Sequence, residues 1–290
     1  IGWDGDQTRR DESRTQRQSS PIGRPVVDLD EQYQTTVQRL AVFAQDEWDV
    51  DESLSAYAGV RWAALRTSTE GQGMVPAGSR SSVLSPVLQV LWKPPGMPGD
   101  QVRLAVSRTY KAPRAVDLIP RRFVAIDNTP TTPNLQGNPQ LRPELAWGID
   151  LAFEHALPRK IGHVNVNATA RRIRDVTLDR LFLDNGAWVS TKANGGSARI
   201  FGLEIESRVN VRTAWAGAPD LDVRASVSRN WSTVDRVPGP HNRLDSQIPL
   251  SANIGVDWRL PEAPWTVGAN LAHRGSMRAR TSPTQTTATN

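Results

Sequence analysis

Residues 144–155 read ELAWGIDLAFEH, and their side chains alternate between apolar ones and polar or small ones. In an extended strand, successive side chains point to opposite faces, so this stretch has one apolar face and one polar face. The apolar face carries Leu145, Trp147, Ile149, Leu151 and Phe153. Residues 251–259, SANIGVDWR, repeat the pattern. Such a strand either lies half-buried in a soluble β-sandwich or separates lipid from a water-filled lumen.

The lengths of the connections distinguish these two environments. The pattern predicts about eleven strands, at residues 1–14, 36–49, 54–66, 83–93, 101–110, 144–156, 163–176, 197–210, 220–231, 248–259 and 265–275. Short turns alternate with long segments, which fall at residues 15–35, 67–82, 111–143, 177–197 and 232–249. Outer-membrane barrels combine short periplasmic turns with long extracellular loops. The sequence therefore predicts an all-β, antiparallel, up-and-down transmembrane β-barrel, with residues 1–290 as one partial barrel domain.

The tryptophans agree with this topology. Trp48, Trp92, Trp258 and Trp265 lie on the apolar side within a few residues of short turns. An aromatic belt at the periplasmic headgroups would place them there. The alternative is that they are aromatic residues at the edge of a soluble core.

The composition is compatible with a barrel. The mean hydropathy is −0.47, and no stretch has the roughly 18 consecutive apolar residues of a membrane helix. Only alternate residues of a barrel strand face lipid, which keeps such averages low. The chain has no cysteine and therefore no disulfide or thiolate metal site. Nucleotide-binding, calcium-binding and nucleophile-elbow motifs are lacking, so we expect neither a cofactor, nor a metal site, nor catalysis.

The two ends indicate a fragment. The chain starts at Ile1 within a strand pattern, without an apolar signal segment, and residues 282–290 have the polar composition of a further outer loop. Eleven is an odd number, whereas bacterial single-chain barrels have an even number of strands. We therefore expect missing strands and an open sheet whose first and last strands are not paired.

Several segments resemble one family in order and spacing. They are residues 40–62 (LAVFAQDEWDVDESLSAYAGVRW), 84–94 (LSPVLQVLWKP), 107–113 (SRTYKAP), 137–144 (GNPQLRPE), 194–198 (NGGSA) and 202–206 (GLEIE). Together they resemble the barrel of TonB-dependent outer-membrane receptors over roughly residues 36–275. The resemblance implies a 22-stranded barrel around an N-terminal plug, in the outer membrane of a Gram-negative bacterium. About half of those strands and no plug are expected in this chain.

The resemblance also implies a function. Such receptors bind a scarce ligand from outside and import it when TonB pulls on the plug, and the ligand is commonly a ferric siderophore. The implied partners are outer-membrane lipid and lipopolysaccharide, the missing plug, TonB through that plug, and a small anionic ligand such as a ferric chelate. Haem is disfavoured because residues 111–143, where haem receptors of this family carry a coordinating histidine, contain none. His241, in another outer loop, is expected to be solvated rather than a ligand.

The charge favours an anionic cargo. The net charge is +5, and many arginines fall in the expected outer segments. Bidentate arginine suits the carboxylates and phenolates of ferric chelates. The candidate ligand-binding residues at the outer rim are Arg108, Tyr110, Arg121 and Arg122. The alternative is that outer arginines contact lipopolysaccharide phosphates. Nucleic acid is not expected as a partner, because stacking aromatics are not interleaved with the basic residues.

A second set of charged residues is expected on the lumen face. These residues are Arg61, Arg103, Asp150, Glu154, Glu204, Glu206 and Arg224, and we expect them to pair with one another or with the plug. Other protein classes share the strand alternation. An outer-membrane enzyme barrel, a passive porin and a soluble β-sandwich binding module therefore stay open as alternatives.

Overall fold

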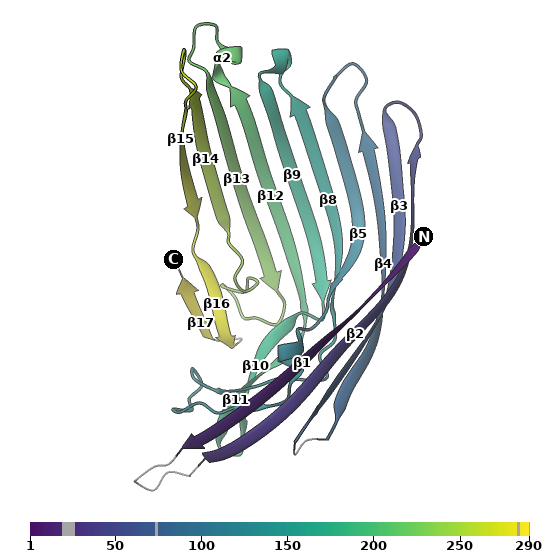
Figure 1. The fold of residues 1–290 in the computed structure, drawn as a ribbon, viewed down its shortest axis with the longest axis vertical. Helices are drawn as coiled ribbons and strands as arrows, with labels where there is room; N and C mark the ends of the chain where they lie inside the picture. The colour runs from purple at the N-terminus through teal and green to yellow at the C-terminus, as the bar shows by residue number, and fades with distance from the viewer. Residues whose placement is uncertain (19–26, 73–74, 283–284, 290) are drawn as a thin grey trace.

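Eleven long strands form one antiparallel sheet in the computed structural model, which describes residues 1–18, 27–72, 75–282 and 285–289. They follow one another in sequence order: β1 (Gly2–Gln18), β2 (Val27–Asp49), β3 (Leu54–Gly71), β4 (Ala77–Trp92), β5 (Gln101–Lys111), β8 (Glu144–Ala156), β9 (Gly162–Arg174), β12 (Ser197–Asn210), β13 (Leu221–Val234), β14 (Leu250–Arg259) and β15 (Thr266–Arg274). The sheet is curved, and β1 and β15 are its two unpaired edges within the described residues (Figure 1). The open, up-and-down topology expected from the sequence is confirmed.

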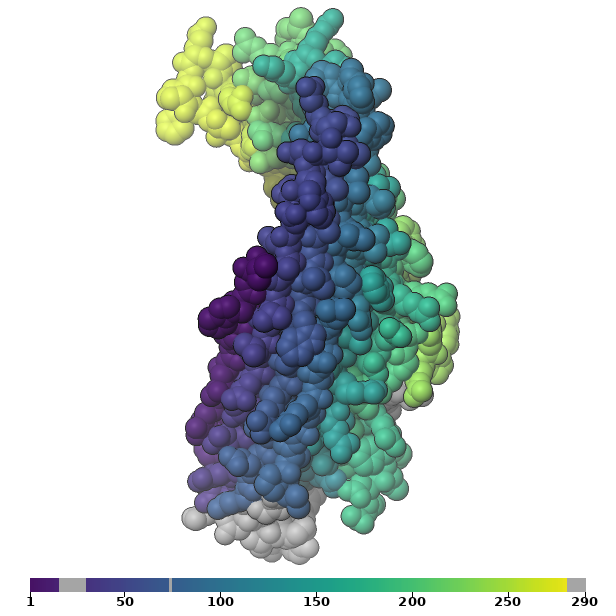
Figure 2. Space-filling view, turned by 90° about the vertical axis from the view of Figure 1, so that its right-hand side faces the viewer, coloured from purple at the N-terminus to yellow at the C-terminus, as the bar shows by residue number. Residues whose placement is uncertain are grey.

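The two faces of the sheet have the expected character. On β8, Trp147, Ile149, Leu151 and Phe153 are 39–51% exposed on one face, whereas Gly148 between them is buried. Strands β1 to β9 run side by side across the face in view in Figure 2. An apolar surface of this extent would be unusual on a soluble monomer. The soluble β-sandwich is excluded, because the described residues form no second sheet of similar size to cover these side chains.

Leu145 departs from the expected pattern. It packs with Tyr110 and Ala112 against Ala41, Ala63, Leu65 and Val83, instead of joining the exposed row of β8. The reason is that β5 pairs with β4 only as far as Ser107 and with β8 up to Lys111, so the outer ends of β5 and β8 separate from β4.

Short, locally bonded turns connect the strands at one rim, at the top of Figure 1. Between β2 and β3, the Asp51 carboxylate accepts a hydrogen bond from the Ser53 backbone (2.7 Å). The other turns include the 3-10 turn η1 (Pro158–Lys160) and helix α2 (Val211–Ala214), where the Asn210 side chain accepts from the Thr213 backbone (2.9 Å). The four tryptophans that the sequence places beside the short turns, Trp48, Trp92, Trp258 and Trp265, are each exposed by 40% or more. An aromatic belt remains the interpretation we favour for them.

Two of the expected outer loops are mostly strand. Residues 15–35 and 67–82 were expected to be loops, but β1 runs to Gln18, β2 starts at Val27, β3 runs to Gly71 and β4 starts at Ala77. Buried hydroxyls extend the pairing there: Thr35 meets Thr69 at 3.1 Å and Thr67 meets Ser79 at 2.9 Å. A search for alternating apolar residues does not detect strands whose inner face is made of threonine.

A second sheet fills two other expected loops. It has the order β10 (Thr177–Asp184), β11 (Ala187–Asn194), β7 (Asn134–Gln136) and β6 (Arg122–Phe123), and helix α1 (Ala115–Leu118) precedes it. Strand β11 pairs in parallel with β7, which joins residues 111–143 to residues 177–197. This outer sheet lies at the rim opposite to the short turns (Figure 1).

A third outer segment follows β15. Strands β16 (Met277–Ser282) and β17 (Gln285–Thr289) form a separate hairpin. The neighbouring loop, residues 235–249, is anchored by Leu244, which packs against a core formed by Val176, Ala198, Val234 and Val237. No helix in the described part of the chain has the length and apolar character needed to cross a membrane.

Candidate functional site

The candidate site is built on the polar face of β1 to β5. The Arg61 guanidinium binds the Asp4 carboxylate at 2.5 Å, and Arg39 binds Asp6 at 3.0 Å. Arg39 on β2 also lies beside the hydroxyl of Tyr110 on β5, although β3 and β4 lie between these two strands. Neighbouring strands are about 4.8 Å apart, so this contact requires the inner side chains to converge. The polar face is therefore concave here.

Tyr110 lies over this concave face. Its ring packs on the inner cluster of Ala41, Ala63, Leu65 and Val83. Its hydroxyl oxygen is buried beside the guanidinium groups of Arg39 and Arg61 and has no hydrogen-bond partner of good geometry in the described chain. A phenol held beside two cations can donate to, or accept from, a ligand that carries an oxyanion.

Arg108 is two residues before Tyr110 on β5. Its Nη1 donates to the Leu84 carbonyl oxygen of β4 at 3.2 Å, and its Nε is buried without a partner. It makes no ion pair with any described residue. The positive charge of Arg108, near the point where β5 separates from β4, is therefore not neutralised by a described carboxylate.

Arg121 and Arg122 are adjacent in sequence but take different partners. Arg121 is only 7% exposed, lies 3.5 Å from the Glu12 carboxylate of β1 and covers the Phe123 ring at 3.9 Å. Arg122 binds Asp184 of β10 at 2.6 Å and the Gln136 side chain at 2.9 Å. Arg121 thus joins the outer sheet to β1 while Arg122 holds the outer sheet together. The structure thus places Tyr110 and Arg121 on the inner side of the outer rim and Arg122 in the outer sheet, while Arg108 contacts the backbone of β4.

The lumen-face residues pair mainly outside their own set. Asp150 binds Arg171 at 3.3 Å, Glu154 accepts from Gln101 at 2.5 Å, and Arg224 binds Asp257. Arg61 binds Asp4, as described above. Arg103, Glu204 and Glu206 have no ion pair in the described part of the chain. Sequence reasoning did not identify these partners, because they lie on other strands whose register it did not predict.

Other outer arginines have varied surroundings. Arg114 binds Asp117 within α1 at 2.8 Å, and Arg180 covers Phe182 at 5.8 Å. Arg24 and the side chain of Arg17 lie outside the described residues. The described residues contain no group of three or more metal-ligating side chains. Sequence reasoning also missed a cavity with an arginine-rich lining at the outer rim, because its two walls come from separate segments, around positions 243 and 278.

Comparison with known proteins identifies the family. The family described as "TonB dependent receptor-like, beta-barrel" matches residues 1–289. No curated protein matches the sequence. Among solved structures, the chain is similar to the copper transporter OprC, with a TM-score of 0.65 and 13% identity over 95% of this chain and 40% of that one.

Two further solved structures that this chain resembles are receptors for different cargoes. The ferric-catecholate import receptor Fiu of E. coli has a TM-score of 0.64 at 12% identity, over 94% of this chain and 41% of that one. The Serratia marcescens hemophore receptor HasR has a TM-score of 0.64 at 11% identity, over 99% of this chain and 52% of that one. The chain thus spans about two fifths to one half of the length of these proteins, and the likeness concerns the fold. With its family match, sheet topology and exposed apolar face, the chain belongs to the TonB-dependent receptor β-barrel family.

Proposed function

We propose that this chain forms part of the wall of an outer-membrane receptor that takes up a scarce, small anionic ligand, a ferric siderophore, in a TonB-energised cycle. Its partners are outer-membrane lipid and lipopolysaccharide around the wall, a plug domain inside it, and TonB acting through that plug. Barrels of this family are outer-membrane proteins of Gram-negative bacteria, which supports this localisation. The family consists of receptors and transporters, and this supports transport over an enzyme barrel.

One observation carries the choice of an anionic ligand. The Nε atoms of Arg39, Arg108 and Arg121 and the Tyr110 hydroxyl are all buried in the described chain without a hydrogen-bond partner. Buried polar groups in folded proteins are nearly always satisfied, so several orphaned ones toward the outer half of the same strands point to a missing partner. Three of the four atoms are N–H donors of a permanent cation, and the partner that suits them is an oxyanion.

The carboxylates already present do not cancel this preference. Asp4 and Asp6 hold Arg61 and Arg39, and Glu12 holds Arg121, but each guanidinium has five N–H donors and a carboxylate uses at most two of them. The acids therefore fix the orientation of the guanidinium groups and leave donors for a ligand. Phenolate, catecholate and carboxylate oxygens of a ferric chelate are acceptors of this kind.

The test uses the full-length protein in detergent and radiolabelled ferric complexes of catecholate, hydroxamate and carboxylate chelators. The variant combines Arg108→Gln, Tyr110→Phe, Arg121→Gln and Arg122→Gln. We expect weaker binding of the preferred complex and a flatter dependence of its affinity on salt, because fewer cations attract it.

A matched control removes charge at the opposite rim. Lys160 and Arg212 are exposed in the short turns, so the double variant Lys160→Gln, Arg212→Gln should leave affinity and salt dependence unchanged. Hydrogen exchange on β10 and β11 checks that loss of the Arg122–Asp184 ion pair has not unfolded the outer sheet. An affinity equal to that of the wild type in the quadruple variant would remove this cluster from the ligand site.

A further inference from the structure

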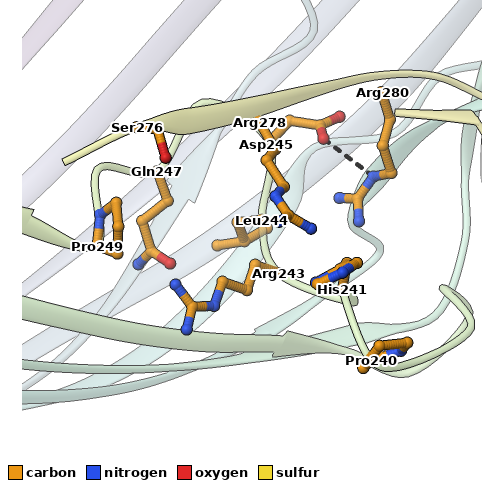
Figure 3. Close-up of a pocket in the computed structure, with 10 residues that line it drawn as sticks. All are labelled: Pro240, His241, Arg243, Leu244, Asp245, Gln247, Pro249, Ser276, Arg278 and Arg280. Carbon is orange, nitrogen blue, oxygen red and sulfur yellow. Dashed lines mark ion pairs between the residues drawn. The ribbon is translucent and has the colours of Figure 1, made fainter. Parts of the chain in front are cut away.

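A cavity of about 350 Å³ lies at the outer rim between the loop of residues 235–249 and strand β16 (Figure 3). Its lining includes His241, Arg243 and Asp245 from the loop, and Arg278 and Arg280 from β16. None of these residues belongs to the cluster around Tyr110. The volume is at the lower end of the range for sites that hold small organic ligands.

The walls of this cavity are fixed to the rest of the fold. The Leu244 side chain packs against the core around Val234, and its backbone N–H donates to the Ser232 hydroxyl at 3.0 Å. The Ser246 N–H donates to the Arg278 carbonyl oxygen at 2.9 Å, which joins the loop to β16. The cavity therefore does not depend on two independently moving loops.

Arg280 is the informative residue. Its side chain is 5% exposed, and its Nε binds the Asp245 carboxylate at 2.9 Å. Its Nη2 is buried and has no hydrogen-bond partner in the described chain. Figure 3 shows the free end of this guanidinium turned away from Asp245 and toward His241, inside the lined space. A buried cationic N–H group without an acceptor is costly, unless an acceptor occupies the space that it faces.

The charges around this space favour an anion. Asp245 is the one acid in the lining, and it is bound to Arg280. Arg243 and Arg278 are exposed and add two positive charges. Three guanidinium groups from the two walls match a planar or tetrahedral oxyanion. Such an anion can accept two parallel hydrogen bonds from the N–H groups of one guanidinium.

We propose that the cavity between residues 235–249 and β16 is an oxyanion-binding site, in which Arg280 donates through Nη2 and Arg243 and Arg278 complete the positive lining. The bound group is a carboxylate or a phosphate. It comes either from a soluble organic acid or from a lipopolysaccharide phosphate at the membrane surface. The site stands on its own geometry and does not require the chain to import iron.

The test measures binding to the full-length protein in detergent by isothermal titration calorimetry. Citrate, inorganic phosphate and lipopolysaccharide micelles are the three probes. In the variant Arg243→Gln, Arg278→Gln, affinity for the wild type's preferred probe should fall at least about tenfold, because each lost charge-assisted hydrogen bond accounts for roughly that factor. Arg280→Lys keeps a positive charge beside Asp245 but removes the additional N–H donors of the guanidinium. It should weaken binding without unfolding the loop.

The control is Arg274→Gln, which removes an exposed arginine at the outer end of β15 that does not line the cavity. It should bind all three probes like the wild type. Preferential binding of citrate identifies a soluble acid as the natural source, and preferential binding of lipopolysaccharide that is lost on its dephosphorylation identifies the lipid. Equal affinities of the wild type and the double variant for all three probes, including no binding at all, would overturn the proposal.

Discussion

The eleven-stranded sheet and the outer four-stranded sheet are both antiparallel over most of their pairs, yet they are stabilised differently. In the large sheet, alternation assigns each residue to one of the two faces, and the strands pair in the order in which they occur in the sequence. In the outer sheet, β7 and β11 pair in parallel although more than fifty residues separate them in sequence, and side-chain amides complete the pairing. The large sheet therefore depends on the lipid and water on its two faces, whereas the outer sheet depends on specific side-chain contacts.

Side-chain amides of two asparagines provide these specific contacts in the outer sheet. The buried Asn134 accepts from the Ala125 N–H at 2.9 Å and from the Asn128 side chain at 3.0 Å. Asn128 in turn accepts from the Trp188 N–H at 2.6 Å and donates to its carbonyl oxygen at 2.8 Å. A substitution in this network should act locally, whereas a substitution on the apolar face of the large sheet should affect insertion of the whole wall.

The largest effect is expected on the apolar face. Leu151 lies in the middle of β8, pairs with Leu104 and Ala168, and is 44% exposed. In a bilayer, Leu151→Arg should destabilise the folded protein by about 2–4 kcal/mol, because a charged group near the midplane of the lipid face is poorly solvated. Folding free energies of the full-length protein in lipid vesicles measure this cost.

The control places the same residue on the other face at nearly the same level. Ala105 pairs with Asp150 and Gln89 on the polar face, so Ala105→Arg adds a cation beside a carboxylate. It should cost much less than Leu151→Arg. Equal costs for the two variants would contradict the assignment of one face to lipid and the other to the lumen.

A smaller and local effect is expected in the outer sheet. Asn134→Ala leaves the Ala125 N–H without its acceptor, at a cost of about 1–3 kcal/mol for an unsatisfied buried donor. Hydrogen exchange should speed up in β6, β7 and β11, while the melting temperature of the large sheet stays unchanged. Thr131→Ala, in the exposed turn of the same loop, should change neither quantity. A fall in melting temperature as large as that of Leu151→Arg would show that the two sheets unfold together.

Alternation made the large sheet predictable. Leu104, Leu151 and Val256 are where the sequence pattern places them, because the requirement for one apolar face acts on every strand in the same way. The pattern failed where other forces hold the strands. The outer end of β3 is closed by Thr67 and Thr69, whose hydroxyls carry no apolar signal. The parallel pairing of β7 with β11 depends on a contact distant in sequence, and local propensity contains no information about it.

The candidate site was only partly predictable. Arg108 and Tyr110 could be proposed from charge and position, but the contact of Tyr110 with Arg39 depends on the departure of β5 from β4 after Ser107. Arg280 could not be found in this way, because its role depends on burial by a separate loop. Residue type indicates the chemistry of a site, and only tertiary structure shows which donors are left without acceptors.

The smallest effect is expected at the short-turn rim. There the large sheet, like the outer sheet, depends on specific side-chain hydrogen bonds. The Asp100 carboxylate, which is 6% exposed, binds the His155 ring at 2.8 Å and accepts from the Ala156 N–H at 3.0 Å. These contacts hold the pKa of Asp100 below its ordinary value, chiefly through the hydrogen bond with His155.

A carboxyl whose pKa is lower in the folded than in the unfolded chain stabilises the fold above its unfolded pKa, about 3.9 for aspartate. This contribution disappears as the pH falls through the lowered folded pKa. The protection factor of the 93–100 turn, which compares its hydrogen exchange with that of an unstructured chain at the same pH, should therefore fall below about pH 4 in the wild type. In Asp100→Asn the same turn should exchange faster already at pH 7 and respond less to acid, while exchange in the β10–β11 hairpin stays as in the wild type. If the turn of the variant kept the acid response of the wild type, Asp100 would not be the group that couples this rim to pH.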